Sequence, residues 1–170
     1  MNILVLNGSP RVEGNTSAHV AAFAEGAQSA GHQVTVIQVG TKKISGCMDC
    51  GYCRGRGNNT CAIMDDMQQV YQAMENADMI VIASPIYHWS LTGQMQSTIT
   101  RFYAPRFPRA KKYALILSSG SNGVYDAPIS QMRSVVSYFG AELVGIRTVY
   151  GTNNKSQRTL EEMRSFGASL

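Results

Sequence analysis

The sequence predicts an α/β fold in which helices cover both faces of a parallel β-sheet. Five short apolar segments rich in β-formers alternate with five segments of helical pattern along the 170 residues. Each connection between parallel strands must cross a face of the sheet, so this alternation places helices on both sides. A hydrophobic content of 44% and a charged content of 15% are typical of a compact globular protein. The length fits one domain over residues 1–170.

The first half of the chain contains two of these strands and a long loop. ILVL (3–6) is a short apolar run that ends at a polar turn, as buried parallel strands do. An apolar stripe predicts a helix over 16–30, which Gly31 ends, and VTVIQV (34–39) is the second strand. A cysteine-rich loop follows at about 40–66, and its residues 40–63 show no sustained periodicity. Loops of this length inside compact domains are usually functional.

The second half contains the other three strands. Asp65 with Gln68 resembles a capping box that begins a helix running to about residue 77. MIVIA (79–83) is the third strand, SPIYHWS interrupts the pattern, and a helix is expected over 91–103. The remaining segments are a strand over 113–119, a turn over 120–123, a helix over 127–139, a strand over 142–150 and a helix over 156–166.

The loop after the first strand predicts an anion site. It leads into a helix N-terminus, where free amides and the helix dipole favour a phosphate. The spacing matches neither GxGxxG nor a P-loop, which favours a phosphate monoester over a dinucleotide or Mg-ATP. The alternative is that the polar side chains only cap the helix. The candidate donors are Ser9, Arg11, Asn15, Thr16 and Ser17.

Two further loops should lie at the same sheet edge, because ligands of such sheets bind beyond the carboxyl ends of the strands. Aromatic side chains after the third strand suit a planar heterocycle, although core packing or a subunit contact would also explain them. The aromatic candidates are Tyr87, His88 and Trp89, and the segment that contains them begins with Pro85 and Ile86. After the fourth strand, Gly120, Ser121 and Tyr125 form a less specific far wall.

Charge and hydropathy argue against two classes of partner. The formal net charge is +4, and the densest basic stretch consists of Arg101, Arg106, Arg109, Lys111 and Lys112. No aromatic RNA-binding signature accompanies this stretch, so we interpret it as a solvated loop and expect no nucleic-acid partner. No apolar run approaches the roughly 20 residues that span a bilayer, and the N-terminus has no signal-peptide pattern, so we expect a cytoplasmic protein without membrane insertion. His19 and His32 are interpreted as helix-surface residues.

The segments GSPRxxGNTS, DDM and ASPIYHWS together resemble the NAD(P)H-dependent FMN reductase family. The resemblance implies a flavodoxin-like sheet of strand order 2-1-3-4-5, noncovalent FMN at the candidate residues above, NAD(P)H as cosubstrate, and a homodimer or homotetramer. The chain departs from the family after the aromatic loop, where Gln96 and Thr100 replace a frequent lysine and aspartate. This departure concerns the usual subunit contact or donor approach.

The four cysteines, Cys47, Cys50, Cys53 and Cys61, all lie in the long loop. A disulfide is not expected in a cytoplasmic protein. Their clustering is similar to that of iron-sulfur flavoproteins, and the tight triple followed by a distant fourth thiol suits a [4Fe-4S] cluster. Redox-active thiols without metal and a zinc site stay open, although structural zinc usually takes two separated pairs.

We therefore predict an FMN-dependent oxidoreductase that passes electrons from NAD(P)H to a quinone, a flavin or another small acceptor, with a cysteine-bound cluster as one route. The alternative is a noncatalytic electron carrier or redox sensor that acts on a protein partner. The basic charge differs from the acidic surface expected of a flavodoxin, which favours the enzyme. No catalytic residue is assigned, because the cofactor carries the chemistry.

Overall fold

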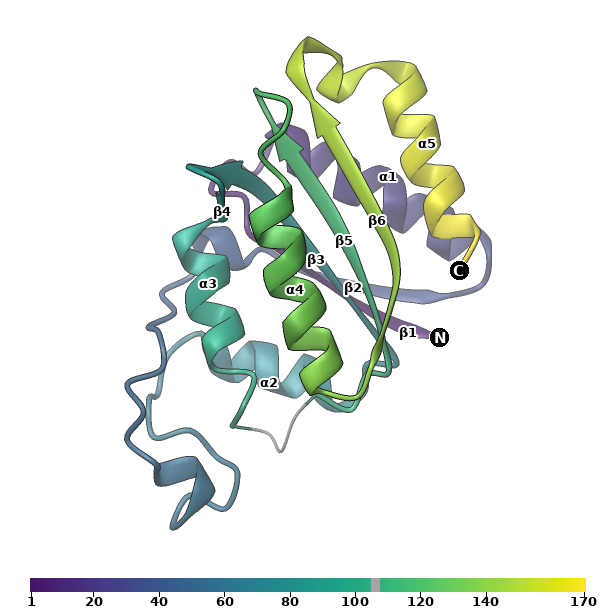
Figure 1. Cartoon of the computed structure of the whole chain (residues 1–170). Coiled ribbons are helices and arrows are strands. Elements are labelled where there is room, and N and C mark those ends of the chain that lie inside the picture. The colour runs from purple at the N-terminus through teal and green to yellow at the C-terminus, as the bar shows by residue number, and fades with distance from the viewer. Residues whose placement is uncertain (105–107) are drawn as a thin grey trace.

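A computed structural model, which describes residues 1–104 and 108–170, has a parallel sheet in the order β2-β1-β3-β5-β6 (Figure 1). The short β4 pairs antiparallel with the end of β3. Counting the five long strands along the chain, this is the predicted order 2-1-3-4-5, and the flavodoxin-like α/β fold is confirmed. The strands are β1 (Asn2–Asn7), β2 (Gln33–Ile37), β3 (Met79–Tyr87), β4 (Ser90–Leu91), β5 (Lys112–Ser119) and β6 (Glu142–Tyr150).

Helices cover both faces of the sheet (Figure 1). One face carries α1 (Asn15–Ser29) and α5 (Gln157–Ala168), and the other carries α2 (Met67–Glu75), α3 (Gly93–Thr100) and α4 (Asp126–Tyr138). Successive side chains of β1 enter the two cores alternately, Ile3 and Val5 on the α1 side and Leu4 and Leu6 on the other. Three short 3-10 helices complete the description, η1 (Val39–Thr41), η2 (Tyr52–Arg54) and η3 (Gly151–Lys155).

Helices α1 and α5 approach so closely that two positions require glycine. A Cβ on Gly26 would lie 1.9 Å from the carbonyl oxygen of Arg164, and a Cβ on Gly167 would lie 2.1 Å from that of Phe23. Both contacts are far shorter than van der Waals distance, so a side chain at either position would push the helices apart.

Two element boundaries differ from the sequence prediction at the aromatic loop. β3 continues through SPIY to Tyr87, because its last residues pair with β4 after leaving the parallel sheet. The following helix begins at Gly93 and ends at Thr100, so it is shorter than the predicted 91–103. Thr92 sets its start, since its hydroxyl accepts a hydrogen bond from the Met95 amide at 3.4 Å.

The predicted capping box of α2 is wrong. α2 begins at Met67, and the side-chain amide of Gln68 donates to the Ile63 carbonyl instead of returning to Asp65. The Asp65 carboxylate does accept a hydrogen bond from the Met67 amide at 3.1 Å, but it also binds a buried arginine, Arg101. The Asp65 side chain therefore combines a local bond at the start of α2 with a tertiary ion pair, and the reciprocal bond from Gln68 is absent.

Two side chains predicted to be solvated are buried. His19 is fully buried, donates from Nε2 to the Asn154 carbonyl oxygen, and has its pKa lowered by that burial. Arg101 is 2% exposed, so the basic stretch is not one solvated loop, while Arg106 lies outside the described residues. His32 is half-buried beside the N-terminal amine. Within the described ranges, no helix is both long and apolar enough to cross a membrane.

Candidate functional site

The carboxyl ends of β1, β3 and β5 meet at one edge of the sheet and surround a pocket of about 100 Å³, here called the sheet-edge pocket. The chain adds β2 on one side of β1 and β3 on the other, so the pocket lies where the strand order reverses. Its lining comes from three loops that are distant in sequence: Ser9, Arg11, Gly14, Asn15 and Thr16, then Pro85, Ile86 and Tyr87, then Ser118, Ser119 and Gly120.

Hydrogen bonds from neighbouring strands hold the first of these loops in place. The side chain of Asn7 accepts from the Ser9 amide at 3.0 Å, and that of Gln38 donates to the Ser9 carbonyl at 2.6 Å. A Cβ on Gly40 would lie 2.1 Å from the same carbonyl oxygen, so the loop packs directly against η1. Asn7, Gln38 and Gly40 thus position the loop, although no sequence motif identified them.

The donor set of the sheet-edge pocket suits an anion. The hydroxyls of Thr16 and Ser118 are hydrogen-bonded to each other at 2.6 Å, which uses one of their two hydrogens and leaves the other for an acceptor in the pocket. Gly14 is the N-cap residue of α1 and, being glycine, provides no side-chain cap. The first amides of the helix can therefore face a ligand, as a phosphate site requires.

Two of the predicted phosphate-loop residues, Ser9 and Ser17, also make hydrogen bonds within the loop, and only Ser9 lines the pocket. Ser17 does not line the pocket, because its hydroxyl donates to the Arg11 carbonyl and accepts from the Asn7 side chain, both at 3.0 Å. Ser9 is buried, and its hydroxyl donates to the Arg11 carbonyl. Arg11 is exposed at the rim of the pocket, where its guanidinium has freedom to approach a charged group.

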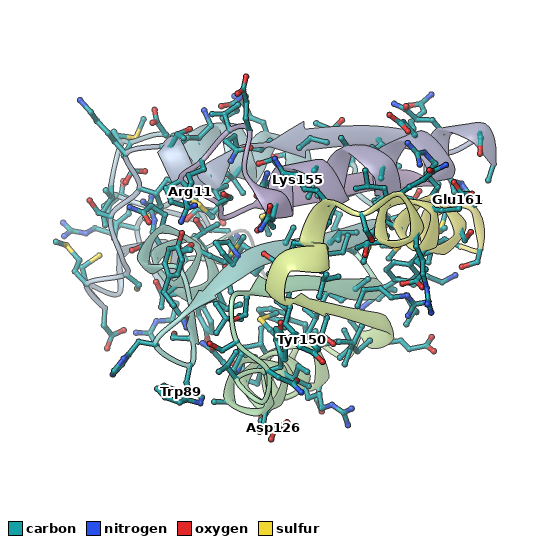
Figure 2. All side chains as sticks on the ribbon, turned by 90° about the horizontal axis from the view of Figure 1, so that it is seen from above. Arg11, Trp89, Asp126, Tyr150, Lys155 and Glu161 are labelled. Atoms are coloured by element: carbon teal, nitrogen blue, oxygen red, sulfur yellow. The ribbon has the colours of Figure 1, made fainter. Side chains whose placement is uncertain are left out.

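The aromatic segment divides between the pocket and the turn beyond it. Pro85, Ile86 and Tyr87 line the pocket, whereas His88 and Trp89 form the β3–β4 turn with φ of 51° and 58°. Seen from above, onto this edge, Trp89 lies at the tip of the hairpin and Arg11 on another loop (Figure 2). Positive φ is unusual for such bulky residues. Trp89 is 58% exposed, so the turn holds it outward and does not pack it into the core.

Of the three predicted far-wall residues, only Gly120 lines the sheet-edge pocket. Gly120 lines the pocket, its φ is not positive, and a Cβ there would meet none of the described atoms within 4 Å, so the fold itself does not require glycine. Ser121 is exposed outside the pocket. Tyr125 is buried and donates to the Val149 carbonyl at 2.8 Å, and burial raises its pKa to about 12. Ser118 and Ser119 were missed, although the hydroxyls that end YALILSS were the available signal.

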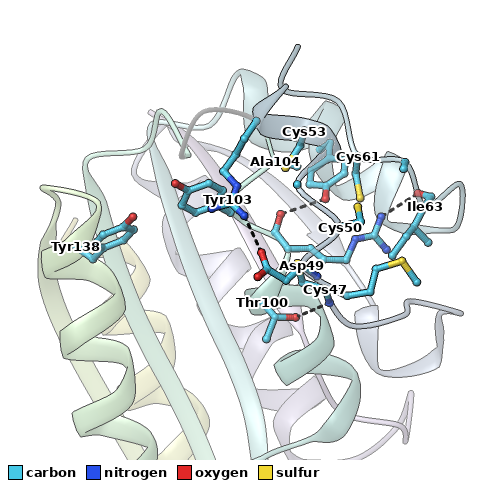
Figure 3. Close-up of a pocket in the computed structure, with 16 residues that line it drawn as sticks. Cys47, Asp49, Cys50, Cys53, Cys61, Ile63, Thr100, Tyr103, Ala104 and Tyr138 are labelled. Atoms are coloured by element: carbon cyan, nitrogen blue, oxygen red, sulfur yellow. Dashed lines mark hydrogen bonds and ion pairs between the residues drawn. The ribbon is translucent and has the colours of Figure 1, made fainter. Parts of the chain in front are cut away.

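The four cysteines line a second cavity of about 380 Å³, here called the cysteine cavity (Figure 3). It lies at the C-terminal end of α3, where the Cys47 amide donates to the Thr100 hydroxyl at 3.2 Å. Thr100 occupies the position of the missing aspartate, so a neutral acceptor takes this bond. The sheet-edge pocket lies near the other end of α3, whose eight residues span about 12 Å. The two sites are therefore separate within one chain.

The geometry of the thiols bears on what they could hold. All four are free, yet among the described residues no three cysteine, histidine, aspartate or glutamate side chains are placed to share one metal ion. Zinc needs its ligands to converge on one point at about 2.3 Å. The four thiols share one cavity without converging on a single point.

A buried ion pair adjoins the cysteine cavity. Arg101 Nη1 lies 2.6 Å from Asp65 Oδ2, and the guanidinium also lies 5.7 Å from the ring of Tyr71. Burial opposes the charge of Asp65, but the hydrogen bonds from Arg101, Ser45 and Met67 hold the pKa of this carboxyl below its usual value. Burial likewise opposes the charge of Arg101, and the Asp65 carboxylate outweighs it, so the pKa of Arg101 is raised.

Comparison with known proteins gives a consistent relationship. Residues 1–165 match the family model described as NADPH-dependent FMN reductase. An iron-sulfur flavoprotein of Archaeoglobus fulgidus is 30% identical over 89% of this chain and 69% of its own length. One of Methanosarcina thermophila is 28% identical over 89% and 81%. The NAD(P)H:quinone oxidoreductase structure from Methanothermobacter marburgensis aligns with a TM-score of 0.73 and covers 99% of this chain and 93% of its own. Because the two sequences are only 15% identical, this similarity supports the fold alone.

Proposed function

Because this chain belongs to the NADPH-dependent FMN reductase family and is thus an oxidoreductase, we propose that it passes electrons from NAD(P)H through FMN to a quinone, a flavin or another small acceptor. The observation that carries the proposal is the sheet-edge pocket, which combines a spare hydroxyl donor, uncapped helix amides and an exposed arginine. Bound FMN would supply hydride acceptance from NAD(P)H and onward electron transfer.

The residues of the sheet-edge pocket have distinct tasks in this proposal. Thr16, Ser118 and the first amides of α1 bind the phosphate, and Arg11 adds charge at the rim. Pro85, Ile86 and Tyr87 lie along the flavin ring, and Gly120 leaves space opposite them. His88 and Trp89 extend outward from the hairpin, which suits contact with a second copy in a homodimer or homotetramer.

Steady-state oxidation of NADH and of NADPH by the FMN-loaded protein tests the proposal, with a quinone, free FMN or no acceptor. Turnover that requires both bound FMN and an acceptor supports the reductase. If FMN binds but no acceptor sustains turnover, the reductase is refuted and the noncatalytic carrier acting on a protein partner takes its place. If the folded protein does not retain FMN, the assignment of the sheet-edge pocket fails as well.

We also propose that Cys47, Cys50, Cys53 and Cys61 hold an iron-sulfur cluster of the [4Fe-4S] type. The shared cavity supports this, as do the relatives named iron-sulfur flavoproteins. Reduced thiols suit a cytoplasmic location. Iron and sulfide analysis of protein purified without oxygen, together with visible absorption, separates the outcomes: a flavin spectrum without iron leaves redox-active thiols, and zinc in place of iron refutes the cluster.

A further inference from the structure

The segment that carries the four cysteines, residues 46–62, is a loop whose two ends are hydrogen-bonded to each other. Its two ends meet at a base where the Lys43 amide donates to Asp66 Oδ2 at 2.8 Å and the Asp66 amide donates to the Lys43 carbonyl at 3.3 Å. The Ser45 amide donates to Asp65 Oδ2 at 2.9 Å. The chain before the first cysteine is therefore held to the chain after the last one.

One guanidinium joins both sides of this base to α3. Arg101 Nη1 donates to the two Asp65 carboxylate oxygens at 2.7 and 2.6 Å and to the Ser45 carbonyl at 3.3 Å. Its Nη2 donates to the Ile63 carbonyl at 3.0 Å. A planar fork of donors can make these bonds together, whereas the compact ammonium of lysine cannot reach all of them.

The same side chain also faces the thiols. Arg101 lines the cysteine cavity and Asp65 does not, so the ion pair presents its positive end to the cavity. Arg101 is 2% exposed, and its two terminal nitrogens are used by the bonds to Asp65, Ser45 and Ile63. What the side chain adds to the cavity is therefore its positive charge, which is poorly screened because it is buried.

We propose that Arg101 is a positioning residue of the cysteine site, which clamps the base of residues 46–62 and holds a positive charge beside the anionic group that the thiols bind. The second part rests on the proposed iron-sulfur cluster. A nearby positive charge stabilises the more negative reduced cluster and thereby raises its reduction potential.

The test uses two variants of the full chain. Arg101→Lys keeps the charge but loses the fork, and the double variant Arg101→Met with Asp65→Asn removes the clamp without leaving an unpaired buried carboxylate. Arg133→Met, at an exposed position of α4, is the matched control. Retained FMN fluorescence quenching shows in each case that the sheet is intact.

The first readout needs no metal. Trypsin cleavage after Arg54 and Arg56 is followed in metal-free protein, and both variants should be cleaved at least about tenfold faster than the parent, because cleavage follows the population of the open loop. Cleavage of both variants within about twofold of the parent rate would overturn the clamp. If Arg101→Lys is cleaved at the rate of the parent while the double variant is cleaved faster, a positive charge without the guanidinium fork is sufficient. That result would also overturn the proposed clamp.

The second readout is the reduction potential of the cluster in the loaded protein. In the double variant the one-electron reduction equilibrium should fall by about tenfold, a decrease of about 59 mV. An unchanged potential would overturn the effect of the Arg101 charge on the cluster. If the parent protein takes up no iron, both the cluster proposal and this charge effect fail, whereas the trypsin result still decides whether Arg101 clamps the base.

Discussion

Replacement of Thr16 by valine tests how the sheet-edge pocket binds its ligand. Thr16 is 1% exposed, and its hydroxyl shares a 2.6 Å hydrogen bond with Ser118. In the proposed site Ser118 donates to Thr16, and the Thr16 hydrogen is directed at the ligand. Valine keeps the β-branched shape and removes the hydroxyl, so the backbone of α1 should not change. A hydrogen bond to a charged acceptor contributes about 1.5–3 kcal/mol. Since 1.4 kcal/mol is a factor of ten, Kd for FMN should rise about 10- to 150-fold.

Quenching of flavin fluorescence gives the affinity directly, with FMN and riboflavin titrated in parallel. Riboflavin has no phosphate, so its affinity should change little in Thr16→Val. Thr35→Val is the matched control, because this threonine is exposed on β2 and far from the pocket in sequence and fold. Equal weakening of both flavins would show that the substitution disturbs the ring site or the fold, and an unchanged Kd for FMN would refute the phosphate assignment.

Two further predictions concern the stability of the fold. Asp65→Asn should lower the free energy of unfolding by about 3 kcal/mol at pH 7, because it leaves Arg101 without its buried counter-ion. The folded-state pKa of Asp65 is lowered, so the stability that its carboxylate contributes is present above about pH 4 and is lost as the pH falls through the folded pKa. Denaturant titrations of parent and variant at about pH 3 and pH 7 check this. An equal difference in the free energy of unfolding at both pH values would contradict it. Gly26→Ala should cost about 2 kcal/mol in the same titrations, since its Cβ would lie 1.9 Å from the Arg164 carbonyl oxygen, despite the better helix propensity of alanine. Gly93→Ala, where a Cβ meets none of the described atoms within 4 Å, is the control and should be neutral or stabilising.

Local patterns in the chain were reliable where local forces decide the structure. The apolar runs became buried strands and the amphipathic segments became helices, because burial of an apolar face depends on the period of the side chains. The loops after three strands met at one edge, since parallel strands all end on the same side. Thr16, Pro85 and Gly120 were therefore found without coordinates.

Predictions based on one side chain failed wherever a distant partner competed for it. Asp65 had the position of a helix cap, yet Arg101, far along the chain, binds its carboxylate. Tyr125 follows a pocket loop, but its hydroxyl finds the Val149 carbonyl in the interior. His19 carried no hydrophobic signal and is nevertheless buried against Asn154.

The sequence by itself determined the flavodoxin-like α/β fold, the sheet edge at which three polar or aromatic loops gather and the segment that contains the four thiols, because each depends on neighbouring residues or on the order of the elements. Only the tertiary structure decided that Thr16 meets Ser118, and that Arg101 closes the base of the cysteine segment and faces its cavity. These contacts join residues that are distant in the chain. Their free energy comes from burial and pairing, which no local spacing encodes.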